Sequence, residues 1–390
     1  MFPRTDSAAV AEFIISDFKD AAERLPVSYS QAKDLGRATK GAATAMLGKT
    51  YLYQRRWSEA ATELGKLLAA PYSYDLTANF FDSFEWHTQN NIESVFELQY
   101  ENLEGRGSTF EKFYGNRAGG RGGEDYAEAD PAALKAFTHT DGTPFDLTTI
   151  PDRNDYSGSN AEIDYGKDLM DWYDSTFSDA DVRLRQSMIL PGDTFVGKGG
   201  LTYKVYWPYQ PYVNAEPKAL RTTWTTVGVI PIRKFLTLGD DNIVRTSDAQ
   251  TNFPLIRFAD VLLMYAEAVN EDQGAVNEVY TAMRKVRRRA HLTDESLPDG
   301  LDKPQMRRQI WLERYRELLF ETHLYFDVKR WHVAHTNDPI FGLNRDIYDF
   351  RGTQKLLTKV FREDRDYRWP IPGSEIDLNP LLKPQNPNWD

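Results

Sequence analysis

The segment from Ile310 to Trp331 constrains the fold of this chain more than any other, because it is strongly helical and yet densely charged. Its less polar face recurs at helical spacing through Ile310, Leu312, Tyr315, Leu318 or Leu319, Thr322 and Phe326. Its other faces are crowded by Glu313, Arg314, Arg316, Glu317, Glu321, Asp327, Lys329 and Arg330. Structural ion pairs are common and catalytic carboxylates are few, so this pattern predicts a salt-bridged structural helix.

Spacing within this helix indicates which charges pair. Arg314 precedes Glu317 by three residues, and Asp327 precedes Arg330 by three. Residues three apart are neighbours on a helix surface, so we expect both pairs to form there. Together with Glu313, these residues are the predicted set of fold-holding ion pairs.

The bulk composition excludes several classes of protein. The 390 residues suffice for one large domain or two to three ordinary ones, and a hydrophobic content of 41% can build a core. A net charge of -11 argues against a nucleic-acid binder, which needs a basic face. The sequence has no cysteine, which excludes disulfides, thiolate catalysis and cysteine-ligated metals. Its start lacks an apolar signal-peptide region, and nowhere are there 18 consecutive apolar residues, so we expect neither a signal peptide nor a membrane span.

The pattern along the chain predicts three parts. Residues 1–71 are expected to be helical, residues 72–252 to form an insertion of loops and short strands, and residues 253–390 to be helical with a proline-rich tail. The first expected helix starts after Asp6 or Ser7 as N-cap and stops at Pro26. The others cover Thr39–Gln54, Ser58–Ala70, Asp164–Phe177, Phe258–Val269 and Val276–Arg289. The expected strands are Ser94–Tyr100 and Val227–Leu236, and the tail Tyr367–Trp389 is expected not to be helical.

A repeat signature occurs in the first part. Leu47, Gly48 and Tyr51 match the L-G-x-x-Y of a tetratricopeptide repeat, and Ala60 and Leu64 fall where that repeat has A-x-x-x-F. Small side chains at Gly48 and Ala60 let two helices approach closely. The sequence therefore predicts a mostly α fold, a tetratricopeptide-like α/α superhelix with an irregular α+β insertion.

Five blocks in this order resemble the SusD/RagB family of surface nutrient-binding lipoproteins. They are Arg37–Tyr53, Asn91–Tyr100, Phe253–Asn270, the segment Glu313–Trp331 and Tyr367–Trp389. Local departures occur at Arg284, His291, Thr322 and Leu324, where the family usually has Asn, Gly, Gly and Arg. The resemblance implies an N-terminally truncated member, because family members begin with a secretory signal, a lipid-bearing cysteine and further helices.

The resemblance also implies a function. Family members bind oligosaccharides, or in some cases peptides, and deliver them to a TonB-dependent, SusC-like transporter in the outer membrane. We therefore expect a cell-surface glycan-binding protein, lipid-anchored in its full-length form, that contacts the membrane only through that anchor. No nucleic-acid partner and no cofactor are expected.

Sugar binding needs flat apolar faces for the C–H side of a pyranose and polar groups for its hydroxyls. The insertion supplies aromatic candidates at Trp86, Trp172, Tyr173, Trp207, Tyr209, Tyr212 and Trp224. It supplies polar candidates at Asn90, Asn91, Asn214, Arg117 and Arg121. Our preferred residues are Trp172, Tyr173, Trp207 and Tyr209, two or more of which we expect to form a solvent-facing platform, with Trp86 and Asn91 as further ligand contacts.

Enzymatic alternatives rest on Asp164, Asp168, Asp171, Asp174, Asp179 and Asp181. Two of these could serve a glycoside hydrolase, although spacing alone does not set the separation that this chemistry needs. The cluster could also hold Ca²⁺, but it lacks the EF-hand pattern. His332 and His335 lie one turn apart, yet no third ligand lies nearby in sequence, so no metal site is expected. With no motif that activates a nucleophile, we expect binding rather than turnover, with a peptide-binding member or a glycoside hydrolase as alternatives.

Overall fold

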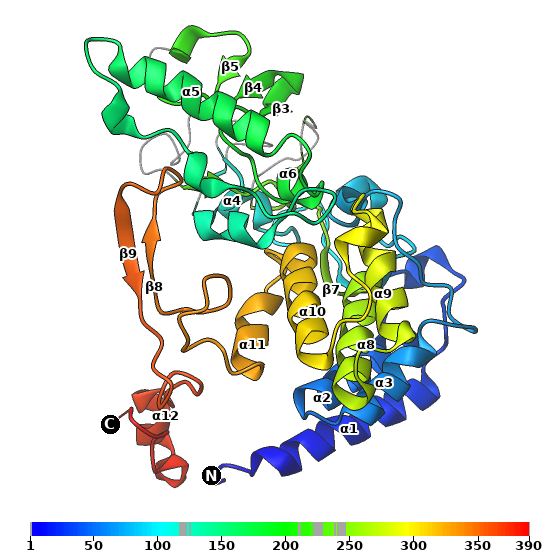
Figure 1. The fold of residues 1–390 in the computed structure, drawn as a ribbon. Helices are drawn as coiled ribbons and strands as arrows, with labels where there is room; N and C mark the ends of the chain where they lie inside the picture. Colours follow the sequence, from blue (N-terminus) through cyan, green and yellow to red (C-terminus); the bar gives the residue numbers. More distant parts are fainter. Residues whose placement is uncertain are drawn as a thin grey trace.

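The scaffold of the protein is a succession of helices, each packed on the next. The computed structural model describes residues 2–116, 123–124, 126–209, 212–220, 229–237, 239 and 247–389. The scaffold helices are α1 (Ser7–Arg24), α2 (Lys40–Tyr53), α3 (Trp57–Lys66), α8 (Phe258–Gln273), α9 (Asn277–Arg289) and α10 (Lys303–Leu318). Figure 1 shows α2 and α3 lying against α8, although nearly 200 residues separate α3 from α8 in the sequence. The predicted tetratricopeptide-like α/α architecture is confirmed.

Local sequence explains these helices. The Asp6 carboxylate accepts from the backbone amides at the start of α1, and the Thr39 hydroxyl caps α2. An added Cβ on Gly48 would lie 2.6 Å from Cγ of Leu64, so the missing side chain permits the close approach of α2 and α3. The helices of residues 1–71 and 253–318 share one hydrophobic core, which includes Ile15, Leu64, Leu263 and Ile310. The three-part division of the chain stays a prediction.

The insertion contains short elements around a second core. These elements are α4 (Phe110–Phe113), α5 (Ala161–Thr176), α6 (Arg183–Ser187), β2 (Glu128–Ala129), β3 (Thr194–Val196), β4 (Thr202–Lys204), β5 (Lys218–Ala219) and β6 (Ile230–Pro231). Strands β3, β4 and β5 form one small sheet, and β2 pairs with β6. Residues after α10, among them Phe341 and Phe350, complete the second core. The insertion is therefore packed against the C-terminal part of the chain.

One antiparallel strand pair joins the insertion to the C-terminal part, and a second pair lies within the C-terminal part. Strand β1 (Ser94–Leu98) pairs with β7 (Phe253–Arg257), so the predicted strand at Ser94–Tyr100 is confirmed. The second pair is the hairpin β8 (Arg345–Tyr348) and β9 (Lys355–Lys359). The predicted strand Val227–Leu236 is wrong over most of its described part, since only Ile230–Pro231 is a strand and Phe235 has a φ of 68°. Residues 227 and 228 lie outside the described residues.

The helix predicted from Ile310 to Trp331 is broken into two. Helix α10 ends at Leu318 and α11 (His323–Arg330) begins five residues later, with φ values of 67° at both Phe320 and Thr322. Buried Lys234 explains the break: its Nζ donates to the carbonyls of Glu317 (3.1 Å) and Leu319 (2.9 Å). These carbonyls would otherwise be unsatisfied at a buried helix end.

The charges of this segment lie inside the protein. Glu313, Arg314, Arg316, Glu317, Glu321 and Asp327 are all buried. The pair Asp327–Arg330 forms at 2.8 Å as predicted from spacing. The predicted pair Arg314–Glu317 is wrong, because tertiary partners replace it: Arg314 binds Asp260 (2.8 Å) and Asp327 (2.9 Å) instead.

Glu313 and Glu317 have arginine partners from distant segments. Glu313 binds Arg183 and Arg287, each at 2.7 Å, and Glu317 binds Arg183 (2.8 Å), Arg257 (2.5 Å) and Arg289. Burial opposes the ionisation of both carboxyls, but the arginines outweigh it and hold the pKa of each below its ordinary value. Both glutamates are therefore charged inside the protein, which ties α10 to the elements that carry these arginines.

The C-terminal tail is partly helical, contrary to prediction. Helix α12 (Gly373–Leu378) follows Pro372, because a proline is tolerated where a helix begins. The tail also meets the N-terminus: Arg4 donates to the side chain of Asn386 (2.9 Å) and to the carbonyl of Pro384 (2.8 Å). Figure 1 shows the two ends of the chain close together.

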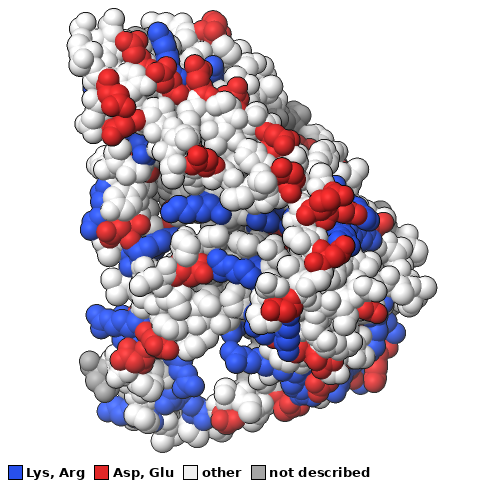
Figure 2. Space-filling view, viewed as in Figure 1, with Lys and Arg blue, Asp and Glu red and all other residues white. Residues whose placement is uncertain are grey.

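The surface carries both signs of charge. Figure 2 shows Lys and Arg side chains interspersed with Asp and Glu over the face in view, rather than gathered into one basic patch. Among the described residues, no helix combines the length and the apolar character needed to span a membrane.

Candidate functional site

A cavity of about 380 Å³ lies beside α5, between the insertion and the β8–β9 hairpin. Its size is within the range of small-molecule sites. One wall is apolar and includes Trp172 and Tyr173 of α5, Leu147, Ile150 and Tyr348 of β8. Strand β8 packs on the 3-10 helix Pro131–Ala136, which brings Tyr348 and the hairpin to the cavity.

The aromatic groups of this wall are held in place by hydrogen bonds. The indole Nε1 of Trp172 donates to Oγ1 of Thr149 (3.0 Å), and the hydroxyl of Tyr173 donates to the carbonyl of Phe350 (2.9 Å). The rings of Trp172 and Tyr173 meet edge to face, with centroids 5.0 Å apart. Tyr173 is buried, whereas Trp172 is half-buried and Tyr348 is 43% exposed. The wall therefore offers preformed aromatic surface at Trp172 and Tyr348.

Polar side chains surround this surface. Lys135 and Asn337 are exposed at the cavity, and Arg345 forms an ion pair with Asp130 at 2.6 Å. Ammonium, amide and guanidinium groups donate hydrogen bonds, and the amide and carboxylate oxygens accept them. Such a set can bind the hydroxyls of a neutral, polar ligand. An aromatic wall with a polar margin is the arrangement that an oligosaccharide requires.

The sequence-predicted platform is only partly present. Trp172 lines the cavity and stays half-exposed. Tyr173 and Trp207 are buried, because each belongs to the second core, so neither presents a ring face to solvent. Tyr209 is half-buried and is not among the described residues that line the cavity. The exposed part of the predicted platform is thus reduced to Trp172 and Tyr209.

Trp207 packs against residues that line the cavity. Its ring lies 5.4 Å from that of Phe350, and the guanidinium of Arg351 lies over it at 4.9 Å. Its carbonyl would be 2.0 Å from a Cβ on Gly166, so the glycine of α5 permits this close approach. Trp207 therefore contacts Phe350 and Arg351, both of which line the cavity.

The remaining predicted contacts lie elsewhere. The side chain of Asn91 donates to the carbonyls of Asp82 (3.2 Å) and Thr88 (2.8 Å) and accepts from the amide of Glu93 (2.9 Å), so it organises its own turn. Trp86 is half-buried and its ring lies beside that of His87. Neither lines the cavity among its described residues. A ligand role for these two residues stays a prediction, and Trp224, Arg117 and Arg121 lie outside the described residues.

Comparison with known proteins assigns the family. Residues 92–389 match the model of the SusD family, which is more than half of the chain. The chain belongs to the SusD family. It is 25% identical to "SusD-like protein P2" of Formosa agariphila, with 99% of this chain and 66% of the relative aligned. It is 27% identical to a SusD-like protein of Bacteroides ovatus, with coverage of 96% and 65%. The chain thus spans about two thirds of the length of these relatives.

Solved structures agree with this assignment. The fold matches a SusD-like carbohydrate-binding protein from Bacteroides fragilis with a TM-score of 0.76 and 25% sequence identity. That match covers 98% of this chain and 72% of the other. The helical scaffold described above is therefore the SusD fold.

Several residues that line the cavity beside α5 were not predicted from the sequence. Lys135, Asn337 and Tyr348 come from segments that showed no ligand-binding pattern, and Tyr348 lies in a part assigned to the scaffold. No local signal identifies them, since 175 residues separate Tyr173 from Tyr348. Only the packing of the hairpin against the insertion brings them together.

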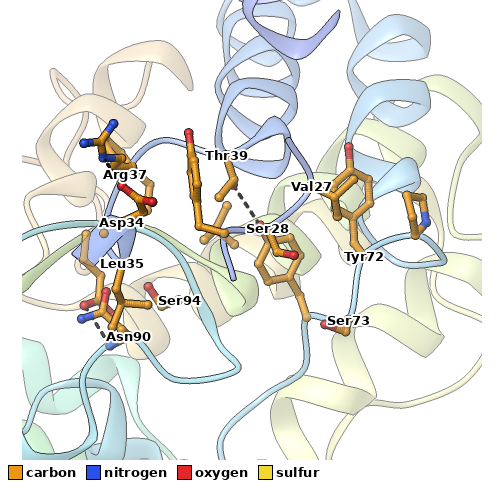
Figure 3. Close-up of a pocket in the computed structure, with 17 residues that line it drawn as sticks. Val27, Ser28, Asp34, Leu35, Arg37, Thr39, Tyr72, Ser73, Asn90 and Ser94 are labelled. Atoms are coloured by element: carbon orange, nitrogen blue, oxygen red, sulfur yellow. Dashed lines mark hydrogen bonds and ion pairs between the residues drawn. The ribbon is translucent and has the colours of Figure 1, made fainter. Parts of the chain in front are cut away.

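A second cavity in this SusD-family chain, of about 240 Å³, lies between the α1–α2 connection and β1. Figure 3 shows Asp34, Arg37, Thr39, Tyr72 and Asn90 around it. Its polar groups are engaged with one another or with neighbours: Asp34 pairs with Arg37 at 3.1 Å, and the Asn90 amide exchanges two hydrogen bonds of 3.0 Å with Gln99. The cavity beside α5 is therefore the stronger candidate.

Three of the aspartates considered for a hydrolase each bind a different partner. Asp168 accepts from the hydroxyl of Tyr156 (2.6 Å), and this bond raises the pKa of Tyr156 to about 12. Asp179 accepts from Thr140 (2.8 Å). Asp181 is buried and paired with Arg183 (2.6 Å). These three carboxylates stabilise the structure around them.

Proposed function

We propose that this chain is a cell-surface glycan-binding protein that captures oligosaccharides in the cavity beside α5. The proposal rests on the indole of Trp172, which is fixed by Thr149 and half-exposed in the cavity that Tyr348 also lines. A pyranose could stack on this surface while Lys135 and Asn337 bind its hydroxyls. Membership of the SusD family supports this reading, as does the fold shared with a carbohydrate-binding protein of Bacteroides fragilis.

The cavity is suited to binding without covalent change. Ligand binding would cost little side-chain conformational entropy, because Trp172 is already held in one orientation. Stacking and hydrogen bonding on an open, half-exposed surface would give modest affinity. Modest affinity suits a protein that passes its ligand on.

The direct test is isothermal titration calorimetry with oligosaccharides that a polysaccharide affinity-gel screen selects. Replacing Trp172 with Ala removes the stacking surface, and we expect the affinity to fall about tenfold or more, equivalent to ~1.4 kcal/mol. Tyr348→Ala should also weaken binding. Calorimetry on the full-length protein should give these two variants the same order of glycan affinity.

Trp369 supplies a matched control. It is 64% exposed and its Nε1 donates to the hydroxyl of Tyr325 (3.0 Å), away from the residues that line the cavity. Trp369→Ala should leave glycan affinity unchanged. A glycan that binds equally well to wild type and to Trp172→Ala would refute the cavity as the site, and Trp86→Ala would then test the other aromatic candidate. Heat with peptides and none with glycans would favour the peptide-binding alternative.

The proposal extends to transport. In the full-length protein a lipid anchor would hold this chain on the outer face of the outer membrane, where it would pass its ligand to a SusC-like TonB-dependent transporter. Family membership supports this role. Cells that lack the gene should take up the bound oligosaccharide more slowly, and Trp172→Ala should restore uptake less well than wild type. Equal uptake in all three strains would contradict delivery.

A further inference from the structure

Three potential metal ligands meet where α11 ends. His332 and His335 follow this helix, and Glu363 comes from the segment that leads into the C-terminal tail, 28 residues after His335. Their ligand atoms all lie within 4.8 Å of one another. From the sequence no metal site is expected, because no third ligand lies near the two histidines in the chain. The fold supplies that ligand.

The distances match a metal centre. Oε1 of Glu363 lies 3.4 Å from Nε2 of His332 and 3.4 Å from Nε2 of His335. Ligands of a tetrahedral ion bound at about 2.0–2.1 Å are separated by roughly 3.3 Å. Both carboxylate–imidazole distances therefore match this spacing, and the two imidazole nitrogens lie within 4.8 Å of each other.

The side chains around these ligands orient them. Nδ1 of His335 is hydrogen-bonded to the hydroxyl of Tyr367 (2.8 Å), which leaves Nε2 directed to Glu363. A partner on the second ring nitrogen is typical of metal-binding histidines. The ring of Tyr367 also lies against that of His332, with centroids 4.4 Å apart. One tyrosine thus contacts both histidines.

The backbone also holds the ligands in place. His332 has a φ of 61°, and its amide donates to the carbonyl of Lys329 (3.0 Å), which ends α11 at this point. Phe361, two residues before Glu363, is buried in the second core. Both segments that supply ligands are therefore fixed before any ion binds.

We propose that His332, His335 and Glu363 form a binding site for a divalent transition-metal ion, with Zn²⁺ as the best match, that fastens the C-terminal tail to α11. Two imidazoles and one carboxylate suit Zn²⁺ and disfavour Ca²⁺ and Mg²⁺, which prefer oxygen ligands. His332 and Glu363 are 54% and 59% exposed, so an ion can enter from solvent and a water can take the fourth position. The role is structural and is independent of the glycan cavity.

Calorimetry with ZnCl₂ on the purified, chelator-treated chain tests the site. Wild type should bind one Zn²⁺, and His335→Gln and Glu363→Gln should each weaken binding at least tenfold. His291→Gln is the matched control, because His291 is exposed and lies outside the cluster, and it should bind like wild type. Thermal melts in chelator should be the same for all variants, which shows that each is folded.

Two further arms make the outcome decisive. Ca²⁺ and Mg²⁺ should not displace Zn²⁺, and displacement by either would contradict an imidazole site. Trypsin should cleave after Arg362 and Arg368 more slowly when Zn²⁺ is present, in wild type and not in Glu363→Gln. Zinc binding that persists in a His332→Gln/His335→Gln variant would overturn the site, and binding without protection of the tail would overturn its fastening role.

Discussion

At the scale of single residues, Thr322 lies in a backbone conformation that β-branched residues tolerate poorly. Its φ is 67° and its ψ is -2°, in the left-handed region. The side chain is exposed, and within the described part of the chain it makes no capping hydrogen bond to α11. The family resemblance expects Gly here, and the same holds at His291, where φ is 61°. The break between α10 and α11 therefore carries local strain.

Replacing Thr322 with Gly should relieve this strain. Left-handed backbone costs a residue with a Cβ about 1–2 kcal/mol, and the greater freedom of Gly in the unfolded chain offsets part of that gain. We expect the free energy of unfolding, measured in urea, to rise by about 1 kcal/mol. Thr322→Ala keeps a Cβ and should recover only part of this. A loss of stability in the Gly variant would show that the strain is absent.

At the scale of elements, the α2–α3 pair depends on the missing side chain of Gly48. An added Cβ would meet Cγ and Cδ2 of Leu64 at 2.6 and 2.8 Å, and Leu64 is fully buried. Glycine is otherwise a poor residue inside a helix. Close packing of two helices therefore outweighs helix propensity at this position.

Gly48→Ala distinguishes the two effects by sign. Helix propensity alone would stabilise the protein by about 1 kcal/mol, whereas overpacking against Leu64 should destabilise it by about 1–3 kcal/mol. We expect destabilisation in chemical denaturation. The double variant Gly48→Ala/Leu64→Ala should be more stable than the sum of the two single effects predicts, because the smaller side chain makes room. Strict additivity would argue against the contact.

At the scale of the whole molecule, α10 joins the two hydrophobic cores. Ile310 belongs to the scaffold core and Tyr315 to the core shared with the insertion. Next to them, Glu317 binds Arg183 of α6, Arg257 of β7 and Arg289 of α9. The buried carboxylate of Glu317 thus connects α6 of the insertion with β7 and α9 of the C-terminal part.

Glu317→Gln should weaken the whole fold. It removes the charge that three buried guanidinium groups share, and breaking a buried ion pair costs about 3–5 kcal/mol. Glu59→Gln is the matched control: Glu59 pairs with Arg56 at 2.7 Å on the surface, and its loss should cost about 0.5 kcal/mol or less. Urea denaturation followed by circular dichroism would measure both. Equal losses of stability in the two variants would contradict the stabilising role assigned to Glu317.

Local pattern was sufficient for most helices and for part of the site. Caps, apolar periodicity and the small residues of α2 and α3 predicted where helices form, because these signals act over a few residues. Trp172 was selected as a candidate because aromatic residues in a loop-rich segment are informative. The sequence did not distinguish it from Tyr173 and Trp207, since burial depends on what packs against each ring.

The sequence by itself determined that this chain is a helical scaffold with a loop-rich insertion and that its charged segment is structural. Only the tertiary structure decided which charges pair, because Arg314 and Glu317 bind partners from distant elements rather than each other. It also placed Tyr348 and Trp172 at one cavity and brought Glu363 to the two histidines. The physical reason is the same in each case: a site depends on distances between segments, and those distances are set by packing rather than by sequence spacing.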